Sequence, residues 1–372
     1  RDNPQRALAN NSANYHETPH TGTFLREWTS LYESKSGERG IFSSKASASQ
    51  AKRSSDRLVQ QETHTFGTNP CSEIILRSRE FCNLSEVVIR SDDKMTDVGR
   101  KVRLATMLGT IQSTLTNFKY LTKEWSKNCE EERLLGVSLT GIMDNKLTAN
   151  PKPSELESLR SIAIQTNIAL AEEIGITPSA SITCVKPSGT VSQLVDSASG
   201  IHSRHSPYYI RRVRMDSKDP LTSYMKDLEW FWEPDITKPN DTVVFSFPIQ
   251  SPKGCITRND RSAISQLETW KVYQEHWCQH KPSITITVKE EEWLDVGAWV
   301  LKNFDIMSGV SFLPHSDHIY KQAPYEDCSK KEYKELGHMI CEAHWDDLSQ
   351  YEQEDYTVSS QELACVAGAC EI

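Results

Sequence analysis

The chain of 372 residues has a formal net charge of −9 and contains 37% hydrophobic residues. This composition is typical of a globular protein with one large domain or two to three small ones, and it excludes a disordered chain, which would be poorer in aromatic residues. The acidic balance argues against nucleic acid as a partner, and the apolar runs are far shorter than the ~20 residues that a membrane helix needs, which excludes a transmembrane protein.

Ten cysteines are spread along the chain without the paired C-x-x-C spacing of a structural zinc site, so we predict no metal ligands. A secreted disulfide scaffold would be shorter and denser in cysteine, and no apolar signal-peptide segment is visible after Arg1. We therefore expect a reducing, cytoplasmic compartment in which most of the thiols stay free.

Strands are predicted to alternate with helices along the chain, which favours an α/β fold with parallel pairing. The expected strands lie at the end of 36–44, at 83–90, 242–248, 283–289 and 307–314. The expected helices lie at 100–128, 154–174, 290–304 and 330–348, whereas 45–62 reads as a helix or an exposed connection. Helix 154–174 is the clearest, because Ser154 and Glu157 follow Pro153 in the pattern of a capping box.

The first motif that carries chemistry is Asn69-Pro70-Cys71-Ser-Glu73, with Cys82 eleven residues beyond Cys71. Pro70 favours an extended or turned backbone, and in an extended one Asn69, Cys71 and Glu73 would project to the same side. An amide, a thiol and a carboxylate on one face can act as a clamp, a radical or nucleophile, and a base. A buried structural cysteine beside a surface glutamate explains the spacing equally well.

The second motif, Lys186-Pro-Ser188-Gly189-Thr190-Val-Ser192, follows an apolar run. Small and hydroxylated residues at a strand-to-helix turn expose backbone N–H groups that can hold phosphate. The motif is not a Walker A loop, and on the residues alone an ordinary helix cap is the stronger interpretation.

The third motif is the terminal pair Cys365 and Cys370, which are separated by small residues. Two such thiols near a chain end can form and break a disulfide. A metal-binding tail is the alternative, but no histidine lies nearby, so the redox interpretation is favoured.

Together these segments resemble ribonucleotide reductase in its adenosylcobalamin-dependent (class II) form, of the monomeric ribonucleoside-triphosphate reductase type. GTNPCSEIILRSREFCNLSEVV resembles the finger loop of that family, VKPSGTVSQL with GIHSRHSPYYIRR its substrate-phosphate segment, and ACVAGACEI its redox tail. Further similar segments are LANNSANY, SGERGIF, RLLGVSLTGIMD and GVSFLPHSDHIYKQAPYE.

The resemblance implies a role for each residue of the first motif. Cys71 would be the thiyl radical that takes hydrogen from the ribose 3′ carbon, and Glu73 would be the base for the 3′ hydroxyl. Asn69 would hold the ribose hydroxyls, and Cys82 would be one of two thiols that reduce the 2′ carbon.

The other two motifs receive roles from the same resemblance. Cys365 and Cys370 would re-reduce the active-site disulfide and would then be reduced by thioredoxin or a similar dithiol. The residues that would bind the phosphates of the ribonucleoside triphosphate are Ser188, Gly189, Thr190 and Ser192.

The resemblance also implies an architecture. Residues 1–330 would form the C-terminal part of a ten-stranded α/β barrel with a finger loop at about 67–82. Residues 331–360 would be a helix and an acidic linker, and 361–372 a flexible redox tail. The partner thiol of Cys82 and the deoxynucleotide effector site lie upstream in the family. We therefore expect the C-terminal half of a longer reductase, incomplete or split from an N-terminal portion, and inactive alone.

The prediction for the source of the radical depends on a pair of tyrosines that this sequence lacks. Reductases that use a separate metal subunit carry a Tyr-Tyr relay near the last barrel strand, and 309–314 has no such pair. This absence favours adenosylcobalamin as the cofactor. A fragment of a metal-subunit-dependent reductase and a non-catalytic thiol redox module are the alternatives.

Overall fold

The computed structural model describes residues 12–34, 40–54, 66–315 and 321–352, together with the backbone of two short strands near the C-terminus. The strands are β1 (Ala13–Tyr15), β2 (Ile41–Ser43), β3 (Gly67–Thr68), β4 (Ile75–Leu76), β5 (Asn83–Val88), β6 (Leu135–Thr140), β7 (Thr183–Cys184), β8 (Tyr208–Asp216), β9 (Trp232–Pro234), β10 (Thr242–Gln250), β11 (Thr285–Val288), β12 (Gly309–Pro314), β13 (Tyr325–Asp327), β14 (Cys365–Val366) and β15 (Ala369–Cys370). The helices are α1 (Thr21–Ser34), α2 (Ser44–Ser54), α3 (Met95–Gln112), α4 (Lys123–Glu132), α5 (Lys146–Ala149), α6 (Pro153–Ile174), α7 (Gly189–Leu194), α8 (Pro220–Asp227), α9 (Ala263–His276), α10 (Trp293–Lys302) and α11 (Lys330–His338).

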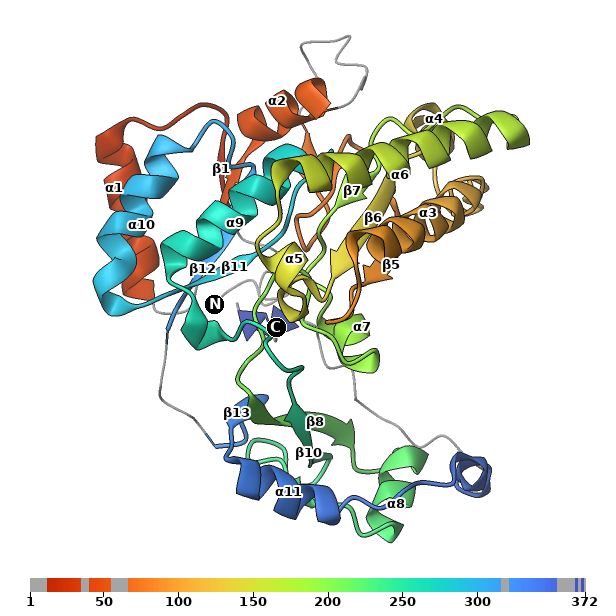
Figure 1. Cartoon of the computed structure of the whole chain (residues 1–372), viewed down its shortest axis with the longest axis vertical. Helices are drawn as coiled ribbons and strands as arrows, with labels where there is room; N and C mark the ends of the chain where they lie inside the picture. The colour runs from red at the N-terminus through yellow and green to blue at the C-terminus, as the bar shows by residue number, and fades with distance from the viewer. Residues whose placement is uncertain are drawn as a thin grey trace.

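The upper part of the molecule in Figure 1 is an α/β body in which helices surround parallel strands. Strands β5, β6 and β7 form one parallel sheet, and β11 pairs in parallel with β12 in a second sheet of order β1-β2-β12-β11. A single parallel bridge between Val185 and Pro282 joins the two sheets. Five parallel strands therefore follow one another in space, and the predicted α/β class with parallel pairing is confirmed.

One apolar core lies within this body and explains why its strands form. All six residues of β6 are buried, as expected for a strand that is covered on both faces. The largest fully buried side chains of the body include Trp270, Tyr273 and Trp277, which come from α9 and the residue after it. Helix α9 therefore joins the core of both sheets, close to the segment that leads into β11.

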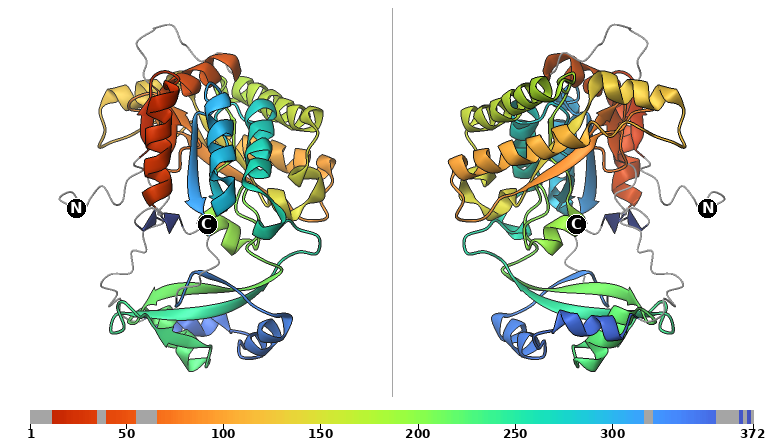
Figure 2. Two further views of the ribbon diagram at one scale, coloured as in Figure 1. Left: turned by 90° about the vertical axis from the view of Figure 1, so that its left-hand side faces the viewer. Right: turned by 90° about the vertical axis from the view of Figure 1, so that its right-hand side faces the viewer.

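The lower part of the molecule is an antiparallel sheet of order β13-β8-β10-β9, covered by α8 and α11 (Figures 1 and 2). It has a small apolar core of its own, centred on Met225, Trp230, Val243 and Phe245. Helix α11 packs on this sheet, with the ring of Tyr333 against that of Tyr208. Separate cores mark this part as a second structural unit.

Three sequence predictions differ from the structure in their boundaries. The helix predicted at 100–128 is two helices, because the hydroxyls of Ser113 and Thr114 bond to backbone carbonyls three residues earlier and end α3. The helix predicted at 330–348 ends at His338 and gives way to a 3₁₀ turn. The capping glutamate of α6 is Glu155, which accepts a hydrogen bond from the Lys152 N–H at 3.1 Å, and not Glu157.

The strands of the described residues are divided among five sheets, and they do not close into a barrel within this chain. None of the described helices is both long and apolar enough to cross a membrane. The acidic segment predicted as a linker, and the tail apart from the backbone of β14 and β15, lie outside the described residues.

Candidate functional site

The motif around Cys71 forms a tight loop that is closed by the short hairpin of β3 and β4. Asn69 organises the turn, because its carbonyl accepts the Ser72 N–H at 2.9 Å and its side-chain oxygen accepts the Ile74 N–H at 3.0 Å. Ser72 has a φ of 67°, in the left-handed region. The backbone is thus turned rather than extended, which is one of the two conformations expected after Pro70.

The thiol and the carboxylate of the loop differ in their environment. Cys71 is half-buried, whereas Glu73 is fully buried. Burial raises the pKa of Glu73 above its ordinary value, and this effect outweighs the opposing influence of nearby hydrogen-bond donors and of the positive charges of Lys186 and Lys281. A carboxyl group with a raised pKa binds a proton more readily than an ordinary glutamate, which suits a base beside a reachable thiol.

Two more thiols lie near this loop. Cys82 immediately precedes β5, and its Sγ would lie 3.0 Å from a Cβ added at Gly136 on β6, so the glycine leaves room for the thiol. Cys184 on β7 is fully buried, and burial raises the pKa of its thiol, with smaller contributions from the charges of Glu73 and Cys82. In the sequence Cys184 is part of an apolar run, and only the order of strands β5, β6 and β7 places its thiol near the loop.

The most extensive support of the loop comes from the segment between α9 and β11, at 280–283. The hydroxyl of Ser283 donates to the Cys71 carbonyl at 2.6 Å, and the Lys281 ammonium donates to the Ser72 hydroxyl at 2.7 Å. The Lys281 N–H donates to the Glu73 carbonyl at 3.2 Å. Sequence reasoning missed this segment, because 283–289 carries only the pattern of a strand.

The predicted phosphate turn lies at the start of α7, as the strand-turn-helix pattern indicates. The Ser188 side chain makes no capping hydrogen bond to the helix; its hydroxyl donates instead to Glu86 on β5 at 2.6 Å. Burial raises the pKa of Glu86 above its ordinary value. Ser188 and Ser192 are buried, whereas Thr190 is exposed. The turn is therefore not a helix start capped by the Ser188 side chain. It lies beside a buried carboxyl group, Glu86, which was not predicted from the sequence.

The structure relates the first two motifs through their charges. Lys186 lowers the pKa of both Glu73 and Glu86, and the charge of Glu73 acts in turn on Glu86. The loop and the turn, more than 100 residues apart in the sequence, thus border one charged region. The side chains of the third motif lie outside the described residues, but the register of β14 and β15 pairs Cys365 directly with Cys370.

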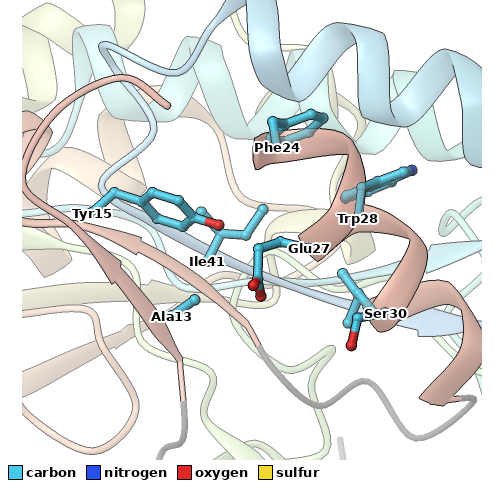
Figure 3. Close-up of a pocket in the computed structure, with 8 residues that line it drawn as sticks. Ala13, Tyr15, Phe24, Glu27, Trp28, Ser30 and Ile41 are labelled. Carbon is cyan, nitrogen blue, oxygen red and sulfur yellow. The ribbon is translucent and has the colours of Figure 1, made fainter. Parts of the chain in front are cut away.

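Two cavities in the described part of the chain lie apart from the predicted site residues, and the larger, of about 650 Å³, is lined by residues that include Lys52, Glu131 and Asn167. The pocket in Figure 3 lies among β1, β2 and α1 and contains none of the predicted site residues. Its apolar lining comes from Tyr15, Phe24, Trp28 and Ile41, with Glu27 at its side. Within the described residues, no cluster of three or more potential metal ligands is found. None of the eight described cysteines with placed side chains takes part in a disulfide.

Comparisons with known proteins identify relatives along most of the chain, although no family model matches it. The adenosylcobalamin-dependent ribonucleoside-triphosphate reductase of Lactobacillus acidophilus is 30% identical over 343 residues, which cover 82% of this chain and 45% of the relative. The proteins of the same name from Levilactobacillus brevis and Euglena gracilis are 27% identical over 90% of the chain and 29% identical over 74%. The chain spans less than half the length of these relatives, 38% to 49%.

Solved structures share the fold. A B-12-dependent (class II) ribonucleotide reductase superposes with a TM-score of 0.75 at 24% identity, over 93% of this chain and 52% of that chain. The alpha subunit of the class Id ribonucleotide reductase of Actinobacillus ureae gives a TM-score of 0.54 at 14% identity, over 78% of this chain and 61% of that one.

Proposed function

The chain belongs to the ribonucleotide reductase family, and from this premise we propose that it is the C-terminal part of an enzyme that reduces ribonucleoside triphosphates to 2′-deoxyribonucleotides. The observation that carries the proposal is the pairing of a half-buried thiol, Cys71, with a buried carboxyl group, Glu73, whose pKa is raised. This pairing supplies a hydrogen-atom acceptor and a proton acceptor on one loop.

The chemistry assigned to the loop is a thiyl-radical reaction. Cys71, as a thiyl radical, removes the hydrogen atom of the ribose 3′ carbon and becomes a thiol. Glu73 accepts the proton of the 3′ hydroxyl, and its raised pKa makes it a stronger base than an ordinary glutamate. The Asn69 oxygen accepts from the loop backbone, and the Asn69 side chain also hydrogen-bonds to Glu73 and opposes the rise of its pKa. We assign the contact with the ribose hydroxyls to the amide N–H₂ group, which is the donor of this side chain.

Reduction of the 2′ carbon consumes two thiols, and Cys82 is one of them. Its partner belongs to the N-terminal portion of the reductase, so the complete site requires both portions. Cys365 and Cys370 return the resulting disulfide to thiols, and thioredoxin or a similar dithiol reduces them in the cytoplasm. Their opposed positions in a two-residue hairpin fit the Cα separation that a disulfide allows.

Adenosylcobalamin is the cofactor that we propose for this chemistry; when bound, it supplies the adenosyl radical that oxidises the thiol. The half-burial of Cys71 fits a large group that approaches the loop from outside the core. The absence of tyrosine from β12 fits a radical that needs no protein relay. Within this chain, two observations support the assignment to cobalamin: the Cys71 thiol is partly exposed, and β12 contains no tyrosine.

The substrate's phosphates are assigned to the turn formed by Ser188, Gly189, Thr190 and Ser192. The first turn of a helix offers N–H groups to an anion, and the side chain of Ser188 does not occupy them. The Gly189 N–H donates to the Pro187 carbonyl at 3.0 Å, so the N–H groups that follow Gly189 are the ones proposed to meet the phosphates. Deoxynucleotide effectors would act on the complete enzyme through its N-terminal portion.

The proposed architecture is the C-terminal part of a ten-stranded α/β barrel, which the N-terminal portion of the reductase would complete. The succession of five parallel strands β5, β6, β7, β11 and β12 supports it, and the loop at about 67–82 would be its finger. We assign residues 1–330 to the barrel portion, with the antiparallel sheet of β8, β9, β10 and β13 as a separate unit within it, 331–360 to a helix and acidic linker, and 361–372 to the redox tail.

A complementation assay tests the proposal. The chain is produced together with the N-terminal portion of a related reductase, and deoxynucleotide formation is measured with a ribonucleoside triphosphate, adenosylcobalamin and thioredoxin. Product is expected only when both portions and the cofactor are present. Turnover that requires a metal subunit in place of cobalamin would identify a metal-subunit-dependent reductase. Thiol exchange without any product would identify a redox module.

A further inference from the structure

The loop that carries Cys71 is held by a continuous row of contacts from a segment about 210 residues later in the chain. Ser283, Lys281 and His280 contact successive positions of the loop, and we call 280–283 the cradle segment. At the far end of the row, the Ile75 N–H donates to His280 Nδ1 at 3.2 Å, while His280 Nε2 lies 2.9 Å from the Leu135 carbonyl. The imidazole must accept at Nδ1 and donate at Nε2, so the row fixes a single neutral tautomer.

Lys281 is the unusual member of the cradle segment. Its side chain has no exposed surface, although lysine is almost never fully buried without a partner. Its ammonium is hydrogen-bonded to the Ser72 hydroxyl at 2.7 Å, and its charge acts on Glu73. A buried ammonium is costly to keep in the core, so a residue that serves packing alone would be apolar.

The residue next to the Lys281 ammonium is Gly309, which has no side chain and leaves space for it. A Cβ added at Gly309, the first residue of β12, would lie 2.4 Å from the Lys281 Nζ and 3.1 Å from the Ser72 Oγ. A side chain at this position would therefore displace the Lys281 ammonium from its place beside the Ser72 hydroxyl. Ser72 itself adopts a φ of 67°, which a side chain other than glycine or asparagine rarely adopts without a compensating contact.

We propose that Lys281 is a positioning residue that holds Ser72 in its left-handed conformation and thereby fixes the adjacent Cys71 and Glu73 for reaction. The inference deepens the proposed reductase function and rests on it for the meaning of that geometry. The hydrogen bond from the buried ammonium to the Ser72 hydroxyl holds the tip of the loop. The Lys281 N–H and the Ser283 hydroxyl hold the carbonyls on either side of it, those of Glu73 and Cys71.

The charge of Lys281 supplies a second effect on the same loop. Burial lowers the pKa of Lys281 to about 7, against the opposing effects of Glu73 on the loop and Cys278 at the end of α9. These two groups, with the neutral Ser72 hydroxyl, are the partners of the ammonium. Protonated Lys281 favours the carboxylate form of Glu73 and makes a charge-assisted hydrogen bond to Ser72, and both effects weaken as the lysine loses its proton.

The test uses the 372-residue chain as it is and does not depend on turnover. Hydrogen exchange of the loop amides and alkylation of Cys71 by iodoacetamide, followed by mass spectrometry, are compared in wild type, Lys281→Met and Ser72→Ala. Each substitution is expected to accelerate both processes about tenfold. The double variant should be no faster than either single one, because both remove the same hydrogen bond.

Two further variants separate positioning from general destabilisation. Gly309→Ala displaces the ammonium without removing it and is expected to accelerate the same amides by a smaller factor. Lys101→Met is the control, since the Lys101 ammonium is likewise hydrogen-bonded, to the Val88 carbonyl and to Asp93, but contacts neither the loop nor the cradle segment. It should leave the loop unchanged. If Lys281→Met prevents folding, Ser72→Ala and Gly309→Ala decide the question.

The pH dependence of hydrogen exchange in the loop separates the two possible roles of Lys281. If Lys281 only filled space, its protonation would not change the exchange rates of the loop amides. After correction for intrinsic exchange, wild type should show a step near pH 7 in the loop amides, and Lys281→Met should not. Loop amides that exchange alike in all variants, or acceleration spread equally over β5 and β6, would overturn the proposal. In an active complemented enzyme, Lys281→Met should lower kcat with little change in KM; if no variant has activity, the loop measurements still decide the role of Lys281.

Discussion

The loop at Asn69–Leu76 and the turn at Lys186–Leu194 border the same charged region but are supported in different ways. The loop is held at several successive residues by the distant cradle segment, including a buried charge. The turn is held by local backbone bonds and by two distant hydrogen bonds, from Ser188 to Glu86 and from the Lys186 N–H to Ser138, and its Leu194 is 84% exposed. The proposed roles fit this difference, because a thiol that meets a single C–H bond would need an imposed geometry, whereas a turn that binds phosphate would leave N–H groups for the ligand.

Replacing the reactive atom of the loop should have the largest effect. Cys71→Ser in the complemented enzyme is expected to lower turnover by at least about 10³-fold, because a hydroxyl does not readily form the required radical. Nucleotide binding, measured by equilibrium dialysis, should stay close to wild type, since the turn is untouched. Turnover above a few per cent of wild type would remove Cys71 from the radical step.

Glu73→Gln should have the next largest effect. The amide keeps the size of the buried side chain but cannot accept the proton of the 3′ hydroxyl. We expect turnover to fall by about 10²- to 10⁴-fold while radical formation, followed by electron paramagnetic resonance, persists. Loss of the radical signal in this variant would assign Glu73 to an earlier step.

The turn should respond in affinity rather than in turnover. Gly189→Val places a branched side chain where the backbone must approach the phosphates, so we expect the substrate KM to rise about tenfold with kcat little changed. Gly189→Ala is the matched control and should have a smaller effect. An unchanged KM, or unfolding of the chain, would make the turn a helix start without a ligand.

The smallest expected effect is on stability and comes from the buried charge beneath the loop. Lys281 has a pKa of about 7 in the folded chain against an ordinary value of 10.5. Between these values the unfolded chain binds more protons than the folded one at this residue, so the free energy of unfolding rises with pH. In urea titrations at about pH 7 and pH 9, wild type should gain stability relative to Lys281→Met. An equal pH dependence of the two would mean that this lysine titrates normally.

The same comparison shows what the sequence could predict. Cys71 and Glu73 lie two residues apart, and Ser188 and Gly189 lie at a strand-to-helix turn, so local spacing was enough to select both motifs. Lys281 could not be found in this way, because it reaches the loop only through the packing of the segment before β11.

For the fold as well, local patterns predicted individual elements but not how the elements are arranged in space. The strands β10, β11 and β12 follow local patterns of β-branched and aromatic residues and were predicted close to their observed bounds. The helix predicted at 100–128 was too long, because its apolar spacing continues past Ser113 although side-chain hydrogen bonds to the backbone end α3 there. The placement of Cys184 and Glu86 beside the motifs depends on the order of strands, which periodicity does not reveal.

The central claim is that the thiol held by this loop takes the hydrogen atom of the ribose 3′ carbon. The most direct measurement is turnover of the complemented enzyme with a ribonucleoside triphosphate that carries deuterium at the 3′ carbon, in competition with the unlabelled substrate. A matched competition uses substrate labelled at the 1′ carbon. We predict that the 3′-deuterated substrate is consumed more slowly than the unlabelled one, and that the 1′ label has no effect. Equal consumption of the 3′-labelled and unlabelled substrates would contradict the assignment.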